Sequence, residues 1–348
     1  MTTVLFTLSR ACTAVALAAA AVFAATPAQA YSELVVFGDS LSDNGNARQA
    51  LADRGFPLPL PVTPYVGGRF TNGPTAAEVL ASTLGIALDN HAYGGAYTGT
   101  GSKFKDITPL LNDTGMADQV SSYIKAAGGP LKADSLYMVW GGGNDFLDVL
   151  VPGVSSETLL AVGTQAIKNI TGHIGALYAA GARDFFVPDL ADFSFTFVAQ
   201  QQPAEGQAAL SSMTAKFNLG MDMALDALEG SLSGITIRRF DTNAVLKAYR
   251  ADLVADGGTL TDRCWGGSYG GVVVSPGLTA CSNPDKYFLF DAVHPTSGVH
   301  QALGMAFAAA VPEPSTTGLA LVGLLGVAVT VGRRRAASQA GQAAPQAA

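Results

Sequence analysis

Residues that bind metals and cofactors are scarce in this sequence, and positive charge is in the minority. Its 348 residues include three cysteines and four histidines, and neither an H-E-x-x-H pair nor a dinucleotide-binding glycine pattern occurs. We therefore expect neither a metal nor a cofactor. Lysine and arginine number 20 against 27 aspartates and glutamates, and no basic stripe is present. An acidic chain of this kind is a poor partner for nucleic acid, so we expect none.

Long apolar runs are also few, and the first lies at the N-terminus. Arg10, the Ala-rich stretch 11–25 and the sequence Ala28-Gln-Ala30 have the order of a secretory signal peptide with a small-x-small cleavage site. A membrane anchor is the alternative, but the run is short for a span and a cleavage site follows it. We predict a signal peptide over residues 1–30, with Tyr31 as the first mature residue.

The second apolar run lies near the C-terminus. Pro-Glu-Pro at 312–314 is followed by an apolar stretch over 319–331 and by arginines at 333–335. This stretch is marginal as a permanent membrane helix. The order of its parts resembles the PEP-CTERM sorting tail of Gram-negative bacteria, which implies transient membrane insertion and cutting by a sorting protease. A plain C-terminal anchor is the alternative. We assign the tail to residues 312–348.

Between these ends, residues 31–311 are enough for one large domain with a substantial core. Loss of both ends removes four arginines and one glutamate, which leaves 26 acidic and 16 basic residues and a net charge of about −10. Cys12 leaves with the signal peptide. The remaining pair, Cys264 and Cys281, is most simply a disulfide in an exported chain. A cysteine-only zinc site would need more ligands than these two.

Apolar, strand-like segments alternate with helical ones along this domain. Strands are expected at 34–37, at a short segment before Gly94, and at 135–140, 184–188 and 235–240. Helices are expected over 47–54, 75–84, 155–180, 203–229, 242–250 and 297–310. Alternation of this kind predicts an α/β fold with a parallel sheet covered on both faces.

The first strand leads into a candidate nucleophile. Gly38 ends the apolar run 34–37, and Asp39 and Ser40 follow it, at the carboxyl end of a strand, where open α/β sheets place their active sites. A serine held there can present its hydroxyl to a cleft, so we take Ser40 as the nucleophile. A turn or a helix cap is the alternative. The Pro-rich loop 56–64 cannot be helical and is expected to form a wall of that cleft.

Two further strand ends carry groups that can bind a negatively charged oxygen. Gly94 and Gly95 can leave backbone N–H groups free to donate, and Asn144, after the strand 135–140, can donate from its side-chain amide. A tight turn and a turn asparagine are the alternatives. These positions gain weight only if they lie close to Ser40.

Before the C-terminal helix, Asp291 and His294 are spaced so that both can face one cleft. Histidine is the usual base for a serine nucleophile, and a carboxylate fixes its tautomer. A capping aspartate with a surface histidine is the alternative. The other histidines of the domain, which are expected to be structural or solvated, are His91, His173 and His300.

A second serine matches a hydrolase pattern without its context. Gly266-Gly-Ser-Tyr-Gly270 satisfies G-x-S-x-G, which needs a strand before it and a helix after it. Residues 271–276 are expected to be strand or loop. We therefore do not take Ser268 as the nucleophile.

Four motifs occur in one order along the domain. They are Phe37-Gly-Asp-Ser-Leu-Ser-Asp43, Asn90-His-Ala-Tyr-Gly-Gly95, Gly142-Gly-Asn-Asp145 and Asp291-Ala-Val-His-Pro295. Their order resembles the GDSL, or SGNH, family of serine esterases and lipases, and Gly68–Gly73 is similar to a stretch of its longer members. The resemblance spans essentially all of residues 31–311 and implies a three-layer α/β/α, flavodoxin-like fold with a central parallel sheet of about five strands.

Carried over position by position, the resemblance implies that Ser40 is the nucleophile, His294 the general base and Asp291 the residue that orients it. It also implies an oxyanion hole made by the Ser40 N–H, the Asn144 side chain and the Gly95 N–H, which the motif register favours over that of Gly94. The Ser-His-Asp triad would act through an acyl-enzyme intermediate.

The expected function is an exported carboxylic-ester hydrolase that crosses the inner membrane and is secreted or held at the cell surface. Its substrate would be a small-molecule, lipid or polysaccharide ester. A polysaccharide O-deacetylase and a phospholipase or lipase are alternatives that use the same site. A non-catalytic surface or matrix protein that retains the fold is an alternative of a different class.

Overall fold

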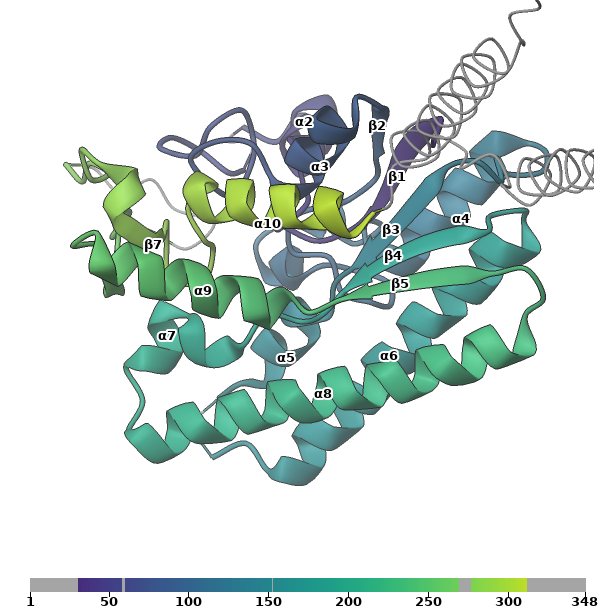
Figure 1. The fold of residues 1–348 in the computed structure, drawn as a ribbon. Coiled ribbons are helices and arrows are strands. Elements are labelled where there is room, and N and C mark those ends of the chain that lie inside the picture. The colour runs from purple at the N-terminus through teal and green to yellow at the C-terminus, as the bar shows by residue number, and fades with distance from the viewer. Residues whose placement is uncertain (1–30, 58–59, 152, 269–276, 312–348) are drawn as a thin grey trace, which may run out of the picture. The chain divides into compact units, whose positions relative to one another are not determined.

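The computed structural model describes residues 31–57, 60–151, 153–268 and 277–311 (Figure 1). The expected signal peptide over 1–30 and the expected sorting tail over 312–348 lie outside these residues. Within the described part of the chain, no helix combines the length and the apolar character that a membrane crossing requires.

Five parallel strands form the central sheet (Figure 1). They are β1 (Glu33–Gly38), β2 (Ala87–Asn90), β3 (Leu136–Trp140), β4 (Asp184–Pro188) and β5 (Thr236–Phe240). Their order across the sheet is β2-β1-β3-β4-β5, which is the flavodoxin-like order. All neighbouring strands are parallel, so their carboxyl ends share one edge. The order reverses at β1 and β3, and such a switch point is where open α/β sheets bind ligands.

Helices cover both faces of the sheet because its strands are apolar on both sides. Val35 and Phe37 of β1 pack in one core with α4, α6 and α8, whereas Leu34 and Val36 pack in a second core with α3, α9 and α10. In Figure 1 these two groups of helices lie on opposite sides of the strands. Their bounds are α3 (Ala76–Leu84), α4 (Met116–Ala127), α6 (Ser156–Ala179), α8 (Ala204–Ser231), α9 (Thr242–Ala255) and α10 (Ser297–Ala310). The predicted three-layer α/β/α fold is confirmed.

The six helices expected from the sequence all form, and the first of them is α2 (Asn46–Asp53). Their ends agree with the prediction to within two residues, except that α9 continues to Ala255. Clear end signals explain this agreement. In α3, Thr75 and Glu78 form a capping box at the start, and Gly85 takes the left-handed conformation at the end.

Several elements lie outside the sequence-based prediction. They are α4, α5 (Gly143–Val149), α7 (Phe197–Gln200), the paired strands β6 (Thr259–Arg263) and β7 (Tyr287–Leu289), and the 3-10 helices Lys103–Asp106, Pro109–Leu111, Phe193–Phe195 and Pro284–Lys286. Apart from α4, these elements are only a few residues long. Periodicity gives little signal over such lengths.

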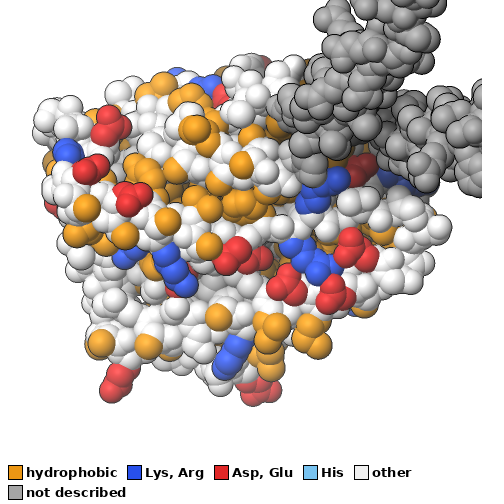
Figure 2. Space-filling view, in the orientation of Figure 1, with side chains coloured by type: hydrophobic (Ala, Val, Ile, Leu, Met, Phe, Trp, Pro, Cys, Tyr) orange, Lys and Arg blue, Asp and Glu red, His pale blue; other side chains and the backbone are white. Residues whose placement is uncertain are grey.

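Charged side chains of both signs are interspersed on the face of the described residues drawn in Figure 2. On β5, Arg238 pairs with Asp184 at 2.9 Å and Arg239 pairs with Glu229 at 2.7 Å. Both pairs are partly buried. Their effect here is to neutralise the arginines locally, so these two residues do not form part of a basic stripe.

Candidate active site

Ser40 lies in a tight turn directly after β1. The carbonyl oxygen of Asp39 accepts the N–H of Asp43 at 2.9 Å, which folds the chain back after Ser40. Only glycine fits at the preceding position, because a Cβ on Gly38 would lie 2.5 Å from the Trp140 carbonyl oxygen of β3. The close approach of β1 and β3 therefore places Ser40 at the switch point of the sheet.

The buried carboxylate of Asp43 ties this turn to the glycine turn after β2. It accepts the N–H groups of Gly45 at 2.8 Å and Asn46 at 2.7 Å, next to the start of α2, and that of Gly94 at 2.6 Å. Burial raises the pKa of Asp43 to about 6, although the N–H donors oppose that shift. One consequence is that the Gly94 N–H is already occupied.

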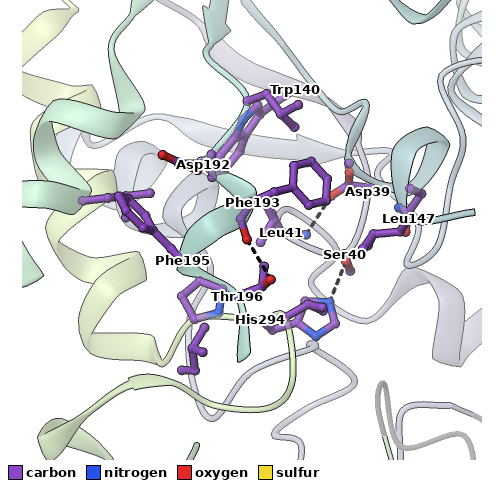
Figure 3. Close-up of a pocket in the computed structure, with 18 of the residues that line it drawn as sticks. Asp39, Ser40, Leu41, Trp140, Leu147, Asp192, Phe193, Phe195, Thr196 and His294 are labelled. Atoms are coloured by element: carbon purple, nitrogen blue, oxygen red, sulfur yellow. Dashed lines mark hydrogen bonds between the residues drawn. The ribbon is translucent and has the colours of Figure 1, made fainter. Parts of the chain in front are cut away.

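Ser40, near the start of the domain, is aligned with His294 and Asp291, near its end. His294 Nε2 lies 2.8 Å from Ser40 Oγ, and His294 Nδ1 lies 2.7 Å from Asp291 Oδ2. Asp291 is fully buried, and the exposed fractions of His294 and Ser40 are 3% and 8%. Figure 3 shows the Ser40 and His294 side chains facing each other. The structure thus brings together the three residues that the sequence nominates.

Hydrogen bonds keep Asp291 ionised in this buried setting. Burial by itself would raise the pKa of Asp291, but the adjacent His294 and the hydrogen bonds from His294 and Tyr65 lower it. Tyr65 Oη donates to Asp291 Oδ2 at 2.6 Å, and the His294 N–H donates to Oδ1 at 2.7 Å. An ionised carboxylate only accepts, so His294 Nδ1 carries the proton and Nε2 is left to accept the Ser40 hydroxyl.

Polar contacts from residues 71 and 72 fix the segment that follows His294. Thr71 Oγ1 donates to the Pro295 carbonyl oxygen at 2.8 Å. Asn72 Oδ1 accepts the Ser297 N–H at 2.9 Å, where α10 begins. The stretch Gly68–Gly73 therefore docks onto the loop that carries the histidine and holds it in place.

The predicted disulfide between Cys264 and Cys281 is present and supports the segment that precedes Asp291. The Trp265 N–H donates to the Phe290 carbonyl oxygen at 2.6 Å, one residue before that carboxylate. Cys264, Trp265 and Phe290 are buried in a small cluster. The disulfide therefore anchors the backbone that binds the residue before Asp291.

Three hydrogen-bond donors near the turn are available to an acceptor. Asn144 is 3% exposed, and its side-chain amide donates one hydrogen to the Ala96 carbonyl oxygen at 3.0 Å and keeps a second. Within the described residues, the N–H groups of Ser40 and Gly95 donate to no acceptor, in contrast to that of Gly94. Gly95 has a φ of +78°, a conformation that favours glycine.

An apolar cavity of about 100 Å³ opens beside Ser40 (Figure 3). Ser40, Asn144 and His294 contribute polar groups to its wall. Most of the remaining wall is apolar and is formed by Leu41, Trp140, Leu147, Leu190, Phe193, Phe195, Leu246, Phe288 and Leu303. The site can therefore bring an apolar group up to a serine hydroxyl, a base and amide donors.

Asp39 also lines this cavity, and its carboxylate accepts the Leu41 N–H at 3.0 Å. Burial raises the pKa of Asp39 to about 6, against the opposing effects of that N–H and of His294. The proton on Asp39 is therefore released closer to neutral pH than that of an ordinary aspartate.

The expectation that the Pro-rich loop 56–64 forms a wall of the cleft is wrong for its described residues. None of them lines the cavity. Its wall is formed instead by residues that follow β3 and β4 in the chain and by residues of α9 and α10. The loop has its own apolar partners, because Phe56 and Leu60 pack with Leu51 of α2. Their apolar side chains therefore contact this cluster and are not part of the cavity lining.

The other histidines do not line the cavity. His173 Nε2 lies 2.7 Å from the Thr98 carbonyl oxygen, and His300 Nδ1 accepts the Ala76 N–H at 3.2 Å. Burial lowers the pKa of His300 to about 3, so it remains neutral near neutral pH. These two residues bind backbone groups, which fits the structural role expected for them.

Ser268, the serine of the G-x-S-x-G pattern, also does not line the cavity. Its carbonyl oxygen accepts a hydrogen bond from the indole N–H of Trp265 at 3.4 Å. Residues 271–276, where strand or loop is expected, lie outside the described residues.

Some residues that shape the site escape reasoning from the sequence. Tyr65 has no neighbouring pattern that points to Asp291, from which it is separated by 226 positions. Asn72 lies in a stretch whose turn chemistry was visible, but its contact with Ser297 was not.

Across the described residues, no group of three or more His, Cys, Asp and Glu side chains is placed to hold a metal ion.

Two models of known protein families match the chain. The family model described as "GDSL-like Lipase/Acylhydrolase" matches residues 34–307, and the model described as "PEP-CTERM protein-sorting motif" matches residues 310–335. Both resemblances inferred from the sequence motifs are therefore confirmed.

Among similar proteins is a GDSL esterase/lipase of Arabidopsis thaliana, 28% identical over 305 residues, which cover 77% of this chain and 79% of the relative. "Lipase 1" of Photorhabdus luminescens is 29% identical over 51% of this chain, but the match spans only 25% of that protein. Among solved structures, phospholipase A1 from Streptomyces albidoflavus aligns with 81% of this chain and 100% of its own, at 16% identity and a TM-score of 0.41.

Proposed function

The chain belongs to the family of GDSL-like lipases and acylhydrolases and is a carboxylic ester hydrolase, and we propose that Ser40, His294 and Asp291 are its catalytic triad. The observation that carries this proposal is the chain of contacts from Ser40 Oγ to His294 Nε2 at 2.8 Å and from His294 Nδ1 to Asp291 Oδ2 at 2.7 Å. Burial of all three residues supports it, because a dry site strengthens these contacts.

In the proposed reaction, His294 takes the Ser40 proton as Oγ attacks the ester carbonyl carbon, and the Asp291 carboxylate stabilises the imidazolium. The tetrahedral intermediate then loses the alkoxide, which takes the proton from Nε2. His294 next removes a proton from water as the water oxygen attacks the acyl-enzyme. Ser40 leaves and regains its proton, so each ester and water yield one acid and one alcohol.

The proposed oxyanion hole consists of the Ser40 N–H, the Gly95 N–H and the Asn144 side-chain amide. The second amide hydrogen of Asn144 supports its part in this set. Gly95 is preferred to Gly94 because the Gly94 N–H already binds Asp43 at 2.6 Å. Donors that are already in place stabilise the developing negative charge without reorganisation.

We place the enzyme outside the inner membrane, secreted or held at the cell surface. The sorting motif at 310–335 supports export, and it implies a sorting protease and transient membrane insertion of the tail. The disulfide is consistent with an oxidising compartment. The proposed boundaries are a signal peptide over 1–30, a hydrolase domain over 31–311 and a sorting tail over 312–348.

The apolar cavity favours an ester with an acyl group longer than acetyl over polysaccharide O-deacetylation. A cavity that holds one water-sized group has a volume of roughly 10–15 Å³. The cavity of about 100 Å³ therefore has room for several carbon atoms. A non-catalytic role has no use for three aligned and buried polar side chains, each of which is costly to bury.

Hydrolysis of p-nitrophenyl esters by the exported protein, compared with the Ser40→Ala variant, tests the triad. We expect Ser40→Ala to lower kcat by on the order of 10⁴-fold or more, because the nucleophile is lost. Ser268→Ala is the comparison variant and should keep most of the activity. If Ser40→Ala retained wild-type activity, or if Ser268→Ala alone abolished it, the assignment of Ser40 would be wrong.

A further inference from the structure

Asp145, the residue after Asn144, makes two hydrogen bonds to one residue of the loop 96–102. Thr98 Oγ1 donates to Asp145 Oδ1 at 2.7 Å, and the Thr98 N–H donates to Asp145 Oδ2 at 3.0 Å. Two hydrogen bonds to one carboxylate restrict the direction of a contact as well as its length. The proposed reaction uses neither side chain, and neither lines the cavity beside the nucleophile.

These two residues lie close in the chain to two of the proposed oxyanion donors. Asp145 follows Asn144 at the start of α5. Thr98 lies three positions after Gly95. Asn144 itself also joins the two segments, because its amide donates to the Ala96 carbonyl oxygen at 3.0 Å. A shift of the loop against α5 would therefore change the spacing between the Gly95 N–H and the amide, and would also turn the amide.

Thr98 is a fixed point against which α5 can be placed. It is fully buried. Its hydroxyl oxygen accepts the side-chain amide of Asn169 at 3.0 Å, and its carbonyl oxygen lies 2.7 Å from His173 Nε2. Both of these partners belong to α6. The loop is therefore held to α6 by one set of contacts, while Asp145 holds α5 to the loop.

Helix α5 depends on such a contact because its own sequence specifies its start poorly. It is seven residues long and begins within the glycine run 141–143, in which Gly142 has a φ of +111°. No side chain caps its first turn. Glycine leaves the backbone more freedom than any other residue. Contacts from outside the helix are therefore needed to fix the direction of Asn144, its second residue.

Taking the proposed oxyanion hole as given, we propose that Asp145 and Thr98 are positioning residues of ester hydrolysis. Their two hydrogen bonds hold α5 against the loop, so that the Asn144 amide and the Gly95 N–H point at the same oxygen. They act through these two donors and do not touch the substrate. Catalytic groups need placement to within about 0.5 Å, and a misplacement of about 1 Å can cost about 10²-fold in rate.

Thr98→Val tests this role with little change of shape, because it removes the hydroxyl and keeps the N–H. With the full-length chain and p-nitrophenyl butyrate, we expect kcat to fall by about tenfold and KM to change by less than about twofold. The donors act on charge that develops in the transition state, so kcat carries the effect. Thr98→Ser restores the hydroxyl and should recover kcat to within about twofold of the wild type.

Asn169→Ala is the matched control. It removes a hydrogen bond to the same hydroxyl from the α6 side and leaves both contacts of Thr98 with Asp145 in place. It should keep wild-type kcat, and thermal unfolding of both variants compares their stability. If Asn169→Ala lowered kcat as much as Thr98→Val, the hydroxyl would contribute only to the stability of the loop, and the proposal would be wrong.

Asp145→Ala removes both hydrogen bonds and should lower kcat by more than Thr98→Val does. The double variant Thr98→Val, Asp145→Ala shows whether the two residues act as a pair. Because the hydroxyl has already lost its partner in Asp145→Ala, the second change should lower kcat by less than about twofold more. Losses that multiply would show two independent effects and would contradict the proposal. If Asp145→Ala does not fold, Thr98→Val and Thr98→Ser decide the question.

A boronic acid reports on the oxyanion hole without turnover. In the proposed site, the boron of butylboronic acid gains a bond to Ser40 Oγ while His294 takes the hydroxyl proton, and the tetrahedral adduct resembles the intermediate. An analogue of this kind measures affinity for the transition state. We expect Thr98→Val to raise its inhibition constant by about the factor by which kcat/KM falls. A lower kcat with an unchanged inhibition constant would overturn the proposal.

Failure of the proposed oxyanion hole gives a different result from failure of the positioning role. If Asn144→Ala kept wild-type kcat, the amide would not be a donor, and the oxyanion hole itself would be wrongly assigned. If Asn144→Ala lost activity while Thr98→Val and Asp145→Ala both kept it, the oxyanion hole would stand and only the positioning role would be wrong. Failure of the triad is recognised separately, because Ser40→Ala would then retain activity.

Discussion

Tyr65 donates a hydrogen bond of 2.6 Å to Asp291 Oδ2, the same oxygen that lies 2.7 Å from His294 Nδ1. A donor to the charged form of a carboxylate lowers its pKa. Tyr65 therefore helps to keep Asp291 ionised, which the proposed mechanism requires when His294 accepts the proton of Ser40. Because it touches Asp291 and lies one residue away from the reacting atoms, Tyr65 is a positioning residue of the proposed triad.

Tyr65→Phe removes this donor and keeps the ring, which packs edge-on against Phe290. A hydrogen bond to a charged group contributes about 1.5–3 kcal/mol, so we expect kcat to fall by roughly tenfold while KM stays nearly unchanged. Steady-state kinetics with a p-nitrophenyl ester measure both constants. Tyr287→Phe removes a hydroxyl from another ring at the same cluster and should keep wild-type kcat. A loss confined to KM would contradict the role of Tyr65.

The sequence predicts well those features that local patterns determine. Residues 34–37 form an apolar run because that strand is buried on both faces, and Asp291 and His294 are three positions apart, so their contact needs only a turn. The start and end of α3 could be read from Thr75, Glu78 and Gly85, which cap it.

Features that depend on distant contacts could not be predicted in this way. Tyr65 reaches Asp291, and Asn72 reaches Ser297, across more than 200 residues, and no periodicity records such pairs. The walls of the cavity come from residues such as Phe193 and Phe288, whose apolar character alone does not distinguish a cavity wall from core. By contrast, α4 was missed although Gly115 and Gly128 flank it, a signal that the sequence does contain.

Asn144→Ala tests the proposed oxyanion hole. The amide would stabilise charge that develops only in the transition state, so we expect kcat to fall by about 10²–10³-fold with little change in KM. The amide also binds the Ala96 carbonyl oxygen, so circular dichroism and thermal unfolding should be recorded beside the kinetics. Asn169→Ala, which removes a hydrogen bond to Thr98 outside the cavity lining, is the comparison. An Asn144→Ala enzyme with wild-type kcat would exclude this donor.

The raised pKa of the Asp39 carboxyl predicts that the stability of the fold depends on pH. Burial raises its pKa in the folded state from 3.8 to about 6. Between these values the folded chain holds a proton that the unfolded chain has released. The stability contributed by this proton is therefore complete below about pH 4 and is lost as the pH rises through 6.

Asp39→Asn removes the titration and keeps an oxygen that can accept the Leu41 N–H. The free energy of unfolding of the variant relative to wild type should therefore rise by about 2 kcal/mol between pH 4 and pH 7. Urea denaturation at several pH values measures it. The exposed Asp106→Asn is the control and should show no such trend. A difference for Asp39→Asn that stayed constant or fell with pH would show that burial does not raise the pKa of this carboxyl.

The disulfide between Cys264 and Cys281 should stabilise both the domain and the position of the acidic residue. It joins residues 17 positions apart, and in the chain-entropy model a loop of this size contributes about 3 kcal/mol. Trp265, next to the bridge, holds the Phe290 carbonyl oxygen beside Asp291 at 2.6 Å. We expect the double variant Cys264→Ser, Cys281→Ser to lose about 3 kcal/mol of unfolding free energy in urea and to show a lower kcat under native conditions.

A reductant distinguishes the effect of the disulfide bond from the effect of replacing the two cysteine side chains. Dithiothreitol should lower the stability of the wild type to that of the double serine variant and should leave the variant unchanged. Loss of stability without loss of kcat would show that hydrogen bonds alone, including that from Trp265 to Phe290, are enough to place Asp291. If the Tm of the variant lies far above the assay temperature, the variant is fully folded during the assay. A loss of kcat in such a variant would show that the bridge positions Asp291 directly.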